Sequence, residues 1–198
     1  SMRRYAVGIL LPVLLAAGCA GIRIPTEGVF PCRMRFEGLL ETKGQRMPVS
    51  GAASLSSASS GLAQIYGPLG LAAFTVHVQD GRVQIMDMWG RTLKTYSVPF
   101  KECIGLLAGI PPRGPYLYRR RVEGGFQVAY LWGEVLLDEA TVPLEMHVNS
   151  GGGLHLTFLR LGEGIRLLMD RGSDKLDLQI QFLEGGRWRQ ASCRRRPQ

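Results

Sequence analysis

The sequence predicts a mainly β protein with a helical lid: an incomplete antiparallel β-barrel of about 10–11 strands, curved around a helix-capped hydrophobic cavity. Three observations predict this fold. Short apolar or alternating segments recur along the chain, with turn residues after about every ten positions. The 26 glycines and 11 prolines favour many turns. One compact helical pattern interrupts the series, and 198 residues are enough for one good core.

The first half of the sheet is expected to contain six strands. Turns of polar residues or glycine separate them, and Asp80-Gly81 is a strong hairpin signal. Phe74, Val76 and Val78 share one face of their strand, because side chains alternate along a strand. The expected strands are residues 33–40, 47–55, 62–66, 71–78, 82–88 and 91–98.

A helix is expected over residues 99–108, with Pro99 near its start and Gly109 at its end. It should cap or fill the concave side of the sheet. Residues 116–121, rich in tyrosine and arginine, are expected to be a connector outside the sheet. The strand rhythm then resumes at residues 126–132, 134–137, 142–149, 154–161, 165–170 and 176–182.

The N-terminal residues have the pattern of a bacterial lipoprotein signal. Arg3-Arg4 precedes an apolar run at 5–15, and small residues at 16–18 lead directly into Cys19. This resembles a lipobox, in which the peptide is cleaved before the cysteine and Cys19 is acylated. A plain secretory signal with a chance cysteine is the alternative. The expected division is a signal peptide at 1–18, a tether at 19–28, one domain at 29–186 and a basic tail at 187–198.

The formal net charge of +8 is compatible with nucleic acid, an anionic membrane surface, or solubility alone. The 24 lysines and arginines concentrate at the two ends and form no stripe interleaved with aromatics, which argues against nucleic acid. A basic tail could attract anionic lipid, or it could simply be solvated.

Four cysteines are present. If Cys19 carries lipid, three remain, and an exported protein meets an oxidising compartment. Cys32 and Cys193 flank the first and last expected strands, so closure of the sheet could bring them into a disulfide. Cys103, on the expected helix, is interpreted as a packed thiol.

No catalytic or metal-binding motif is apparent, so an enzyme, a metal and a cofactor are not predicted. The three histidines have no cysteine or carboxylate partner at ligand spacing in the sequence. His147 and His155 lie on either side of a glycine turn and could face each other. A cross-strand pair is favoured over a metal site.

A turn at Gly67-Pro68-Leu69-Gly70 carries a bare leucine where a polar residue is usual. Phe74-x-Val76, Asp80-Gly81-x-Val83-Gln84-Ile85 and Ile104-Gly105-x-Leu107-x-Gly109-Ile110-Pro111 follow in order. This block resembles LolB, the outer-membrane lipoprotein that receives other lipoproteins from the periplasmic carrier LolA. The clear match covers about 50 residues. Sequence after Pro112 departs from the pattern.

The resemblance implies an incomplete barrel with an apolar cavity for acyl chains and a protruding leucine that drives insertion into the membrane. By motif the insertion loop is Pro68, Leu69 and Gly70. From the residues alone, Leu69 could instead fold back into the core. The candidate cavity residues, each of which could equally be plain core, are Phe36, Ile65, Phe74, Val76, Val83, Ile85, Ile104 and Leu107.

The leading hypothesis is a monomeric, lipid-anchored protein of the bacterial outer membrane that faces the periplasm. It would bind acyl chains, accept lipoproteins from a LolA-like carrier and insert them into the membrane. A scaffolding lipoprotein with a filled barrel and a glycolipid carrier of similar shape are the alternatives. The volume of the interior, or the lipid extracted with the protein, would separate them.

Overall fold

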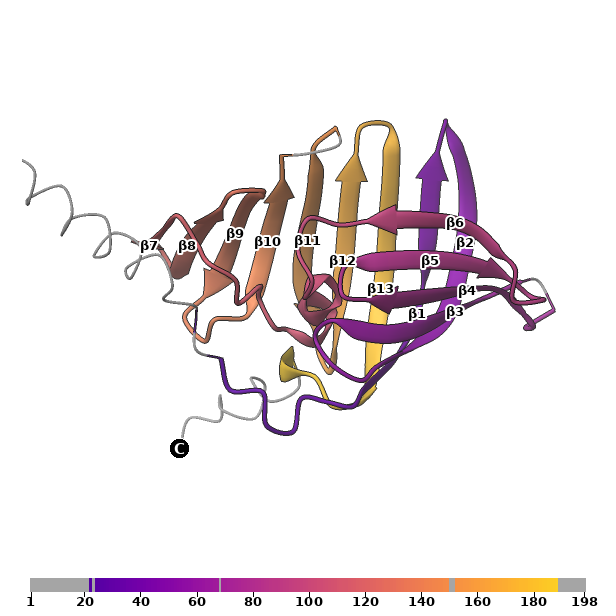
Figure 1. Cartoon of the computed structure of the whole chain (residues 1–198), viewed down its shortest axis with the longest axis horizontal. Coiled ribbons are helices and arrows are strands. Elements are labelled where there is room, and N and C mark those ends of the chain that lie inside the picture. The colour runs from indigo at the N-terminus through magenta and orange to yellow at the C-terminus, as the bar shows by residue number, and fades with distance from the viewer. Residues whose placement is uncertain (1–21, 23, 68, 150–151, 189–198) are drawn as a thin grey trace, which may run out of the picture.

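The computed structural model describes residues 22, 24–67, 69–149 and 152–188. They form one antiparallel sheet of 13 strands (Figure 1). Polar turns and positive-φ glycines separate most strands, as at Gly81 and Gly90. The strands are β1 (Cys32–Thr42), β2 (Gln45–Leu55), β3 (Ser60–Tyr66), β4 (Ala72–Gln79), β5 (Arg82–Asp87), β6 (Thr92–Ser97), β7 (Tyr118–Val122), β8 (Gly125–Tyr130), β9 (Gly133–Asp138), β10 (Pro143–Val148), β11 (Leu154–Leu161), β12 (Gly164–Arg171) and β13 (Asp174–Glu184).

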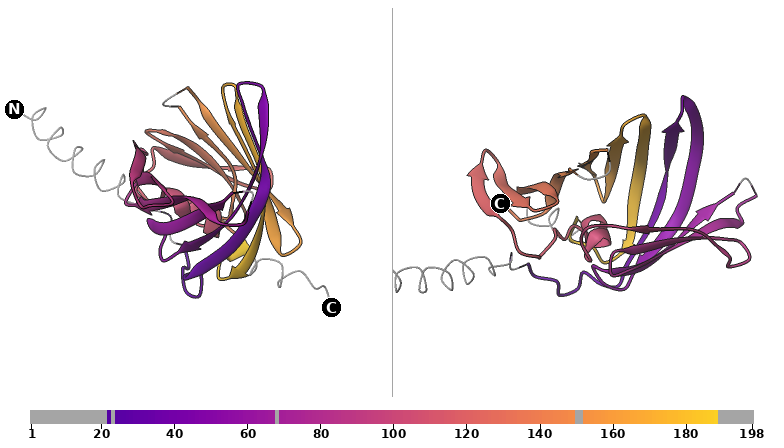
Figure 2. Two further views of the ribbon diagram at one scale, coloured as in Figure 1. Left: turned by 90° about the vertical axis from the view of Figure 1, so that its right-hand side faces the viewer. Right: turned by 45° about the horizontal axis from the view of Figure 1, so that its top comes forward.

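The strand order is β6-β5-β4-β3-β2-β1-β13-β12-β11-β10-β9-β8-β7. Two up-and-down meanders, β1 to β6 and β7 to β13, therefore meet where β1 pairs with β13. The sheet is open: β6 and β7 are its edges. It is strongly curved, so that β3 to β6 cross in front of the long central strands (Figures 1 and 2). An incomplete, curved antiparallel sheet was expected; 13 strands exceed the expected count.

The helical lid is not found among the described residues. The segment 99–108 contains only η1, a 3-10 helix at Cys103–Ala108, which ends at Gly109 in the left-handed conformation. It lies on the concave side of the sheet (Figure 2). Six residues of 3-10 helix are too short to cover the sheet, because their length is about 12 Å at 2 Å per residue. Among the described helices, none is long and apolar enough to span a membrane.

The prediction of a connector at residues 116–121 was also wrong. Residues Tyr118–Val122 form β7, the edge strand next to β8. Its first four residues are exposed, and three of them are arginines. Charged side chains protect an open edge from pairing with another sheet, which explains why this strand reads as a basic connector in the sequence.

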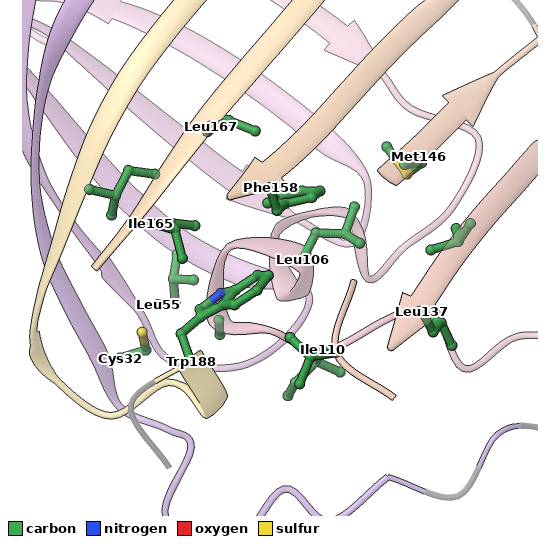
Figure 3. Packing of buried hydrophobic residues seen from close by; sticks show 14 of the residues in the cluster. Cys32, Leu55, Leu106, Ile110, Leu137, Met146, Phe158, Ile165, Leu167 and Trp188 are labelled. Atoms are coloured by element: carbon green, nitrogen blue, oxygen red, sulfur yellow. The ribbon is translucent and has the colours of Figure 1, made fainter. Parts of the chain in front are cut away.

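The hydrophobic core lies at one end of the concave side, around η1 (Figure 3). Leu106, Ala108 and Ile110 are at most 2% exposed there. Met34, Val128 and Ile165 reach the same core from the two meanders. We call this region the base of the concave face. The remainder of the sheet extends from it.

Two residues of the expected basic tail belong to the base. Trp188 is 3% exposed, stacks on Phe158 with a ring-centroid distance of 5.7 Å, and donates from Nε1 to the Leu107 carbonyl at 2.9 Å. Arg187 donates to the carbonyls of Gly109, Ala140 and Thr141. The folded domain therefore extends at least to residue 188. The sequence around residues 187–188 has no alternating apolar pattern, so it indicated only a basic tail.

The expected tether also contributes to the core. Ile22 is 5% exposed and belongs to the buried cluster, against which Ile24 packs. The segment that precedes β1 is therefore partly anchored to the base. The expected signal peptide at 1–18, the acylated Cys19 and residues 189–198 lie outside the described residues.

Candidate functional site

Six of the eight candidate cavity residues lie on the concave face. In an antiparallel sheet, residues directly opposite one another share a face. Phe36 pairs with Gly51, Gly51 with Ile65, and Ile65 with Phe74. Val76 pairs with Ile85 and Val78 with Val83. The register thus gathers residues from four strands onto one side.

The space for Phe36 depends on a glycine. A Cβ atom at Gly51 would lie 2.4 Å from Cζ of Phe36 and 2.2 Å from the Gln64 carbonyl oxygen. Real atoms do not approach so closely, so only glycine lets the Phe36 ring lie flat across β2. The aromatic ring then forms part of the floor of the concave face.

Burial on this face falls from the base outward along β4 and β2. In β4, Val78 is 7% exposed, Val76 is half-buried and Phe74 is 42% exposed. In β2, Leu55 is 3% exposed and Met47 is 41% exposed. Side chains of similar chemistry on the same face are therefore covered at one end and open at the other. The described residues supply no lid over the open end.

The two candidates on η1 have a different position. Ile104 and Leu107 are half-buried and pack against the core at the base. A Cβ atom at Gly61 would meet Cδ1 of Ile104 at 2.9 Å, so Ile104 lies directly on β3. These two residues close the base rather than line the open end.

Leu69 protrudes from the turn between β3 and β4. Its side chain is 86% exposed, which is inconsistent with the alternative that it folds back into the core. The turn is held by hydrogen bonds from the Gly67 amide to the Leu71 carbonyl at 2.9 Å and from the Gly70 amide to the Gly67 carbonyl at 3.0 Å. Gly70 has a φ of 71°, which suits glycine. Pro68 lies outside the described residues.

A second exposed turn, between β5 and β6, lies beside the first. Because β4 pairs with β5, Phe74 opposite Asp87, the two hairpins end at the same corner (Figure 1). Trp89 is 72% exposed and Met88 is 58% exposed; Leu71 in the first turn is 63% exposed. We call these residues the apolar tip: Leu69, Leu71, Met88 and Trp89.

Asp87 holds the second turn in place. Its Oδ1 accepts hydrogen bonds from the amides of Trp89 and Arg91, each at 2.9 Å, and its Oδ2 accepts one from Nε of Arg91 at 2.8 Å. The Arg91 guanidinium lies 5.2 Å from the Trp89 ring centroid. One carboxylate thus orders both the backbone and the cation beside the exposed indole.

These contacts make the turn sensitive to acid. Burial would raise the pKa of Asp87, but the hydrogen bonds from Arg91 and Trp89 outweigh it and hold this pKa below 3.8. A carboxyl whose pKa is depressed by folding contributes stability above its unfolded pKa, and this contribution is lost as pH falls through the folded pKa.

Asp87→Asn should therefore lower the melting temperature near neutral pH and reduce the drop in melting temperature on acidification. Thermal melts at a series of pH values measure this, with Asp80→Asn in the neighbouring turn as control; an unchanged pH profile in Asp87→Asn would contradict it.

A depression of about 710 Å³ on the opposite, convex face has charged groups in its lining. Glu37, Ser50 and the ion pair Arg166–Asp177, whose closest approach is 2.7 Å, contribute to it. Such a lining does not suit a hydrocarbon chain. Another depression, about 520 Å³, lies beside the stacked rings of Phe100, Tyr130 and Trp132. It is an apolar recess at the turn between β8 and β9, separate from the open end.

Among the described residues, Cys32 and Cys103 are not bonded to another cysteine. Cys32 is fully buried beneath Gly186, and burial, assisted by the charge of Glu184, raises the pKa of this thiol to about 12. A thiol in such a site packs rather than reacts. Its expected partner, Cys193, lies outside the described residues, so that disulfide stays a prediction.

The histidine pair has an acidic neighbour that sequence spacing did not reveal. His147 and His155 face each other across β10 and β11, and their ligand atoms and those of Glu145 all lie within 4.8 Å of one another. Strand register, which is not readable from the sequence, produces this cluster on the convex face. It is separate from the concave face.

The structure thus defines an open, curved β-sheet with a hydrophobic concave face and an apolar tip. No protein-family model matches the sequence, and no curated protein matches it closely enough to be a relative.

Several solved structures are similar in shape, and three of them are described here. A LolA superfamily protein from Nitrosomonas europaea has a TM-score of 0.48 and 8% identity, covering 81% of this chain and 86% of that one. A domain described as a candidate outer membrane lipoprotein-sorting protein, from Vibrio parahaemolyticus, has a TM-score of 0.46 and 14% identity, with 79% and 87% covered. A DUF1329 family protein from Desulfovibrio piger has a TM-score of 0.45 and 7% identity, with 76% and 83% covered. All three TM-scores are below 0.5, so these likenesses do not establish a function for this chain.

Proposed function

We propose that this protein binds acyl chains on its concave face and delivers them to a membrane through its apolar tip. The observation that carries the proposal is the gradient of burial along one apolar face. A filled barrel would bury Phe74 and Met47 as well as Val78 and Leu55. Instead the outer residues remain about 40% exposed, although removing apolar surface from water is the main driving force of folding. A hydrocarbon chain laid along them would complete the burial.

The arrangement suits a carrier that releases what it binds. The sheet supplies the concave floor, and the described residues form no lid that would have to open. The apolar tip lies at one end of the four-strand unit β3 to β6 (Figure 2). Ile65, Phe74 and Ile85 of the same unit lie on the concave face. With Cys19 acylated, as the sequence predicts, the protein would be held at one bilayer. The cargo proposed is the acylated end of a lipoprotein received from a periplasmic carrier of LolA type, at the outer membrane.

Exchange of an exposed residue on the concave face tests the binding step. Phe74→Gln should weaken binding of a fluorescent fatty acid by about three- to tenfold, since the 42% of the ring still exposed represents about 0.6–1.3 kcal/mol of possible burial. Leu62→Gln is the matched control: Leu62 is 41% exposed, but it pairs with His77 and so lies on the convex face. Equal losses in the two variants, or none in either, would contradict the proposed surface.

Native mass spectrometry of the full chain identifies the ligand. A lipid-sized mass that is present in the folded protein and lost on denaturation is expected. Its fragmentation separates a lipoprotein acyl chain from a glycolipid. A protein with no such adduct, even after incubation with fatty acid, would instead favour the scaffolding alternative.

A further inference from the structure

The convex face carries a cluster of three potential metal ligands. His147 in β10 lies directly opposite His155 in β11, and their rings stack with centroids 4.0 Å apart and an interplanar angle of 13°. Glu145 precedes His147 by two residues in the same strand, so all three side chains project from the same face. Every ligand atom of the set lies within 4.8 Å of the others.

One of these ligands lacks a partner. Nε2 of His155 is buried and makes no hydrogen bond. The nearest carboxylate oxygen, Oε2 of Glu145, is 3.7 Å away, which is too far for a hydrogen bond. Buried polar nitrogens are nearly always satisfied, and an unsatisfied one requires an explanation, of which an absent ion is one.

The neighbouring strands add negative charge. Glu134 of β9 pairs with His147, and Asp170 of β12 pairs with His155, so a carboxylate lies on each side of the histidine pair on the same face. Both are directly opposite their histidine, where Cβ atoms are about 5 Å apart. A cation between the imidazoles would therefore be in a favourable field.

We propose that Glu145, His147 and His155 form a binding site for a divalent transition-metal ion, Zn²⁺ foremost. Two imidazoles and one carboxylate are a donor set that Zn²⁺ accepts, with a fourth position open to water. Bonds of about 2.0–2.1 Å in a tetrahedral arrangement place donor atoms roughly 3.3 Å apart. Because the donor atoms already lie within 4.8 Å of one another, they must move closer by at most about 1.5 Å, and His147 is an exposed side chain.

Calorimetric titration of the full, untagged chain with ZnCl₂ in metal-free buffer tests the site. One ion per chain is expected, and His155→Gln should raise the apparent Kd more than tenfold. Glu145→Gln should raise it less, because both imidazoles remain. His77→Gln is the matched control: this third histidine lies on the convex side of β4 and should leave the affinity unchanged.

A second readout is independent of affinity. Electron paramagnetic resonance of the Cu²⁺-loaded chain should show two coordinating imidazole nitrogens, and one only in His155→Gln. Equal Zn²⁺ affinity in the unaltered chain and His155→Gln, or an equal loss in His77→Gln, overturns the proposal. Failure here would leave the acyl-chain proposal untouched, because the two sites lie on opposite faces of the sheet.

Discussion

Leu69→Glu should reduce transfer of bound acylated cargo into liposomes by about 100-fold while leaving folding and cargo binding intact. Burying a leucine side chain contributes about 1.5–3 kcal/mol, and a carboxylate at the same place adds a cost of desolvation. Each 1.4 kcal/mol corresponds to a factor of ten in an affinity. Because Leu69 is 86% exposed and touches little of the protein, its exchange should not affect stability.

The measurement is the rate at which a labelled acylated peptide moves from the purified protein to vesicles. Leu131→Glu is the matched control, because Leu131 is equally exposed, at 86%, but lies in the turn between β8 and β9. It should transfer normally. Transfer by Leu69→Glu at the unaltered rate would remove the tip from the mechanism and leave only the binding step.

Trp188→Ala should destabilise the domain by about 3–5 kcal/mol, the usual range for a buried aromatic side chain. That is a large share of the roughly 5–15 kcal/mol that separates folded from unfolded states. The indole is 3% exposed, fills the space beside Phe158, and donates to the carbonyl of Leu107 at the end of η1. Trp188→Phe retains most of the packing and should lose only about 1 kcal/mol with the hydrogen bond.

Urea unfolding measures both variants. Trp89→Ala provides the comparison within the same chain, because this indole is 72% exposed at the tip and its loss should change stability by no more than about 0.5 kcal/mol. If the two alanine variants unfold at the same urea concentration, Trp188 does not hold η1 to the base. Trp89→Ala should instead impair transfer into vesicles.

Local pattern predicted most of the sheet. Alternation and turn residues placed β1 to β6 within a few positions, and the same alternation put Phe74 and Val76 on one face. The short helical segment was predicted in the right place, but as a regular helix that caps a cavity. Its glycines and small residues, with Gly105 against Ala58, instead allow a tight 3-10 turn on the base.

Contacts between distant segments were not predictable. The carbonyls that accept hydrogen bonds from Arg187 belong to two separate loops. In the sequence, Arg187 is only a basic residue at the start of a basic tail. Glu145 meets His155 only through the register of β10 and β11. Edge strand β7 was missed because the arginines that protect it also hide its alternation. The acylation of Cys19 remains a prediction from its motif.

The pairing of β1 with β13 has a consequence for how the protein reaches this shape. Each meander can assemble from neighbouring segments, yet the seam between them joins residues such as Phe36 and Ile180, far apart in the sequence. Contacts of this kind slow folding, because the entropy of closing a long loop must be overcome before they form. Until β13 pairs with it, β1 has an unpaired edge of eleven residues. Shielding this edge would therefore protect the unfinished sheet from pairing with another chain before the seam closes.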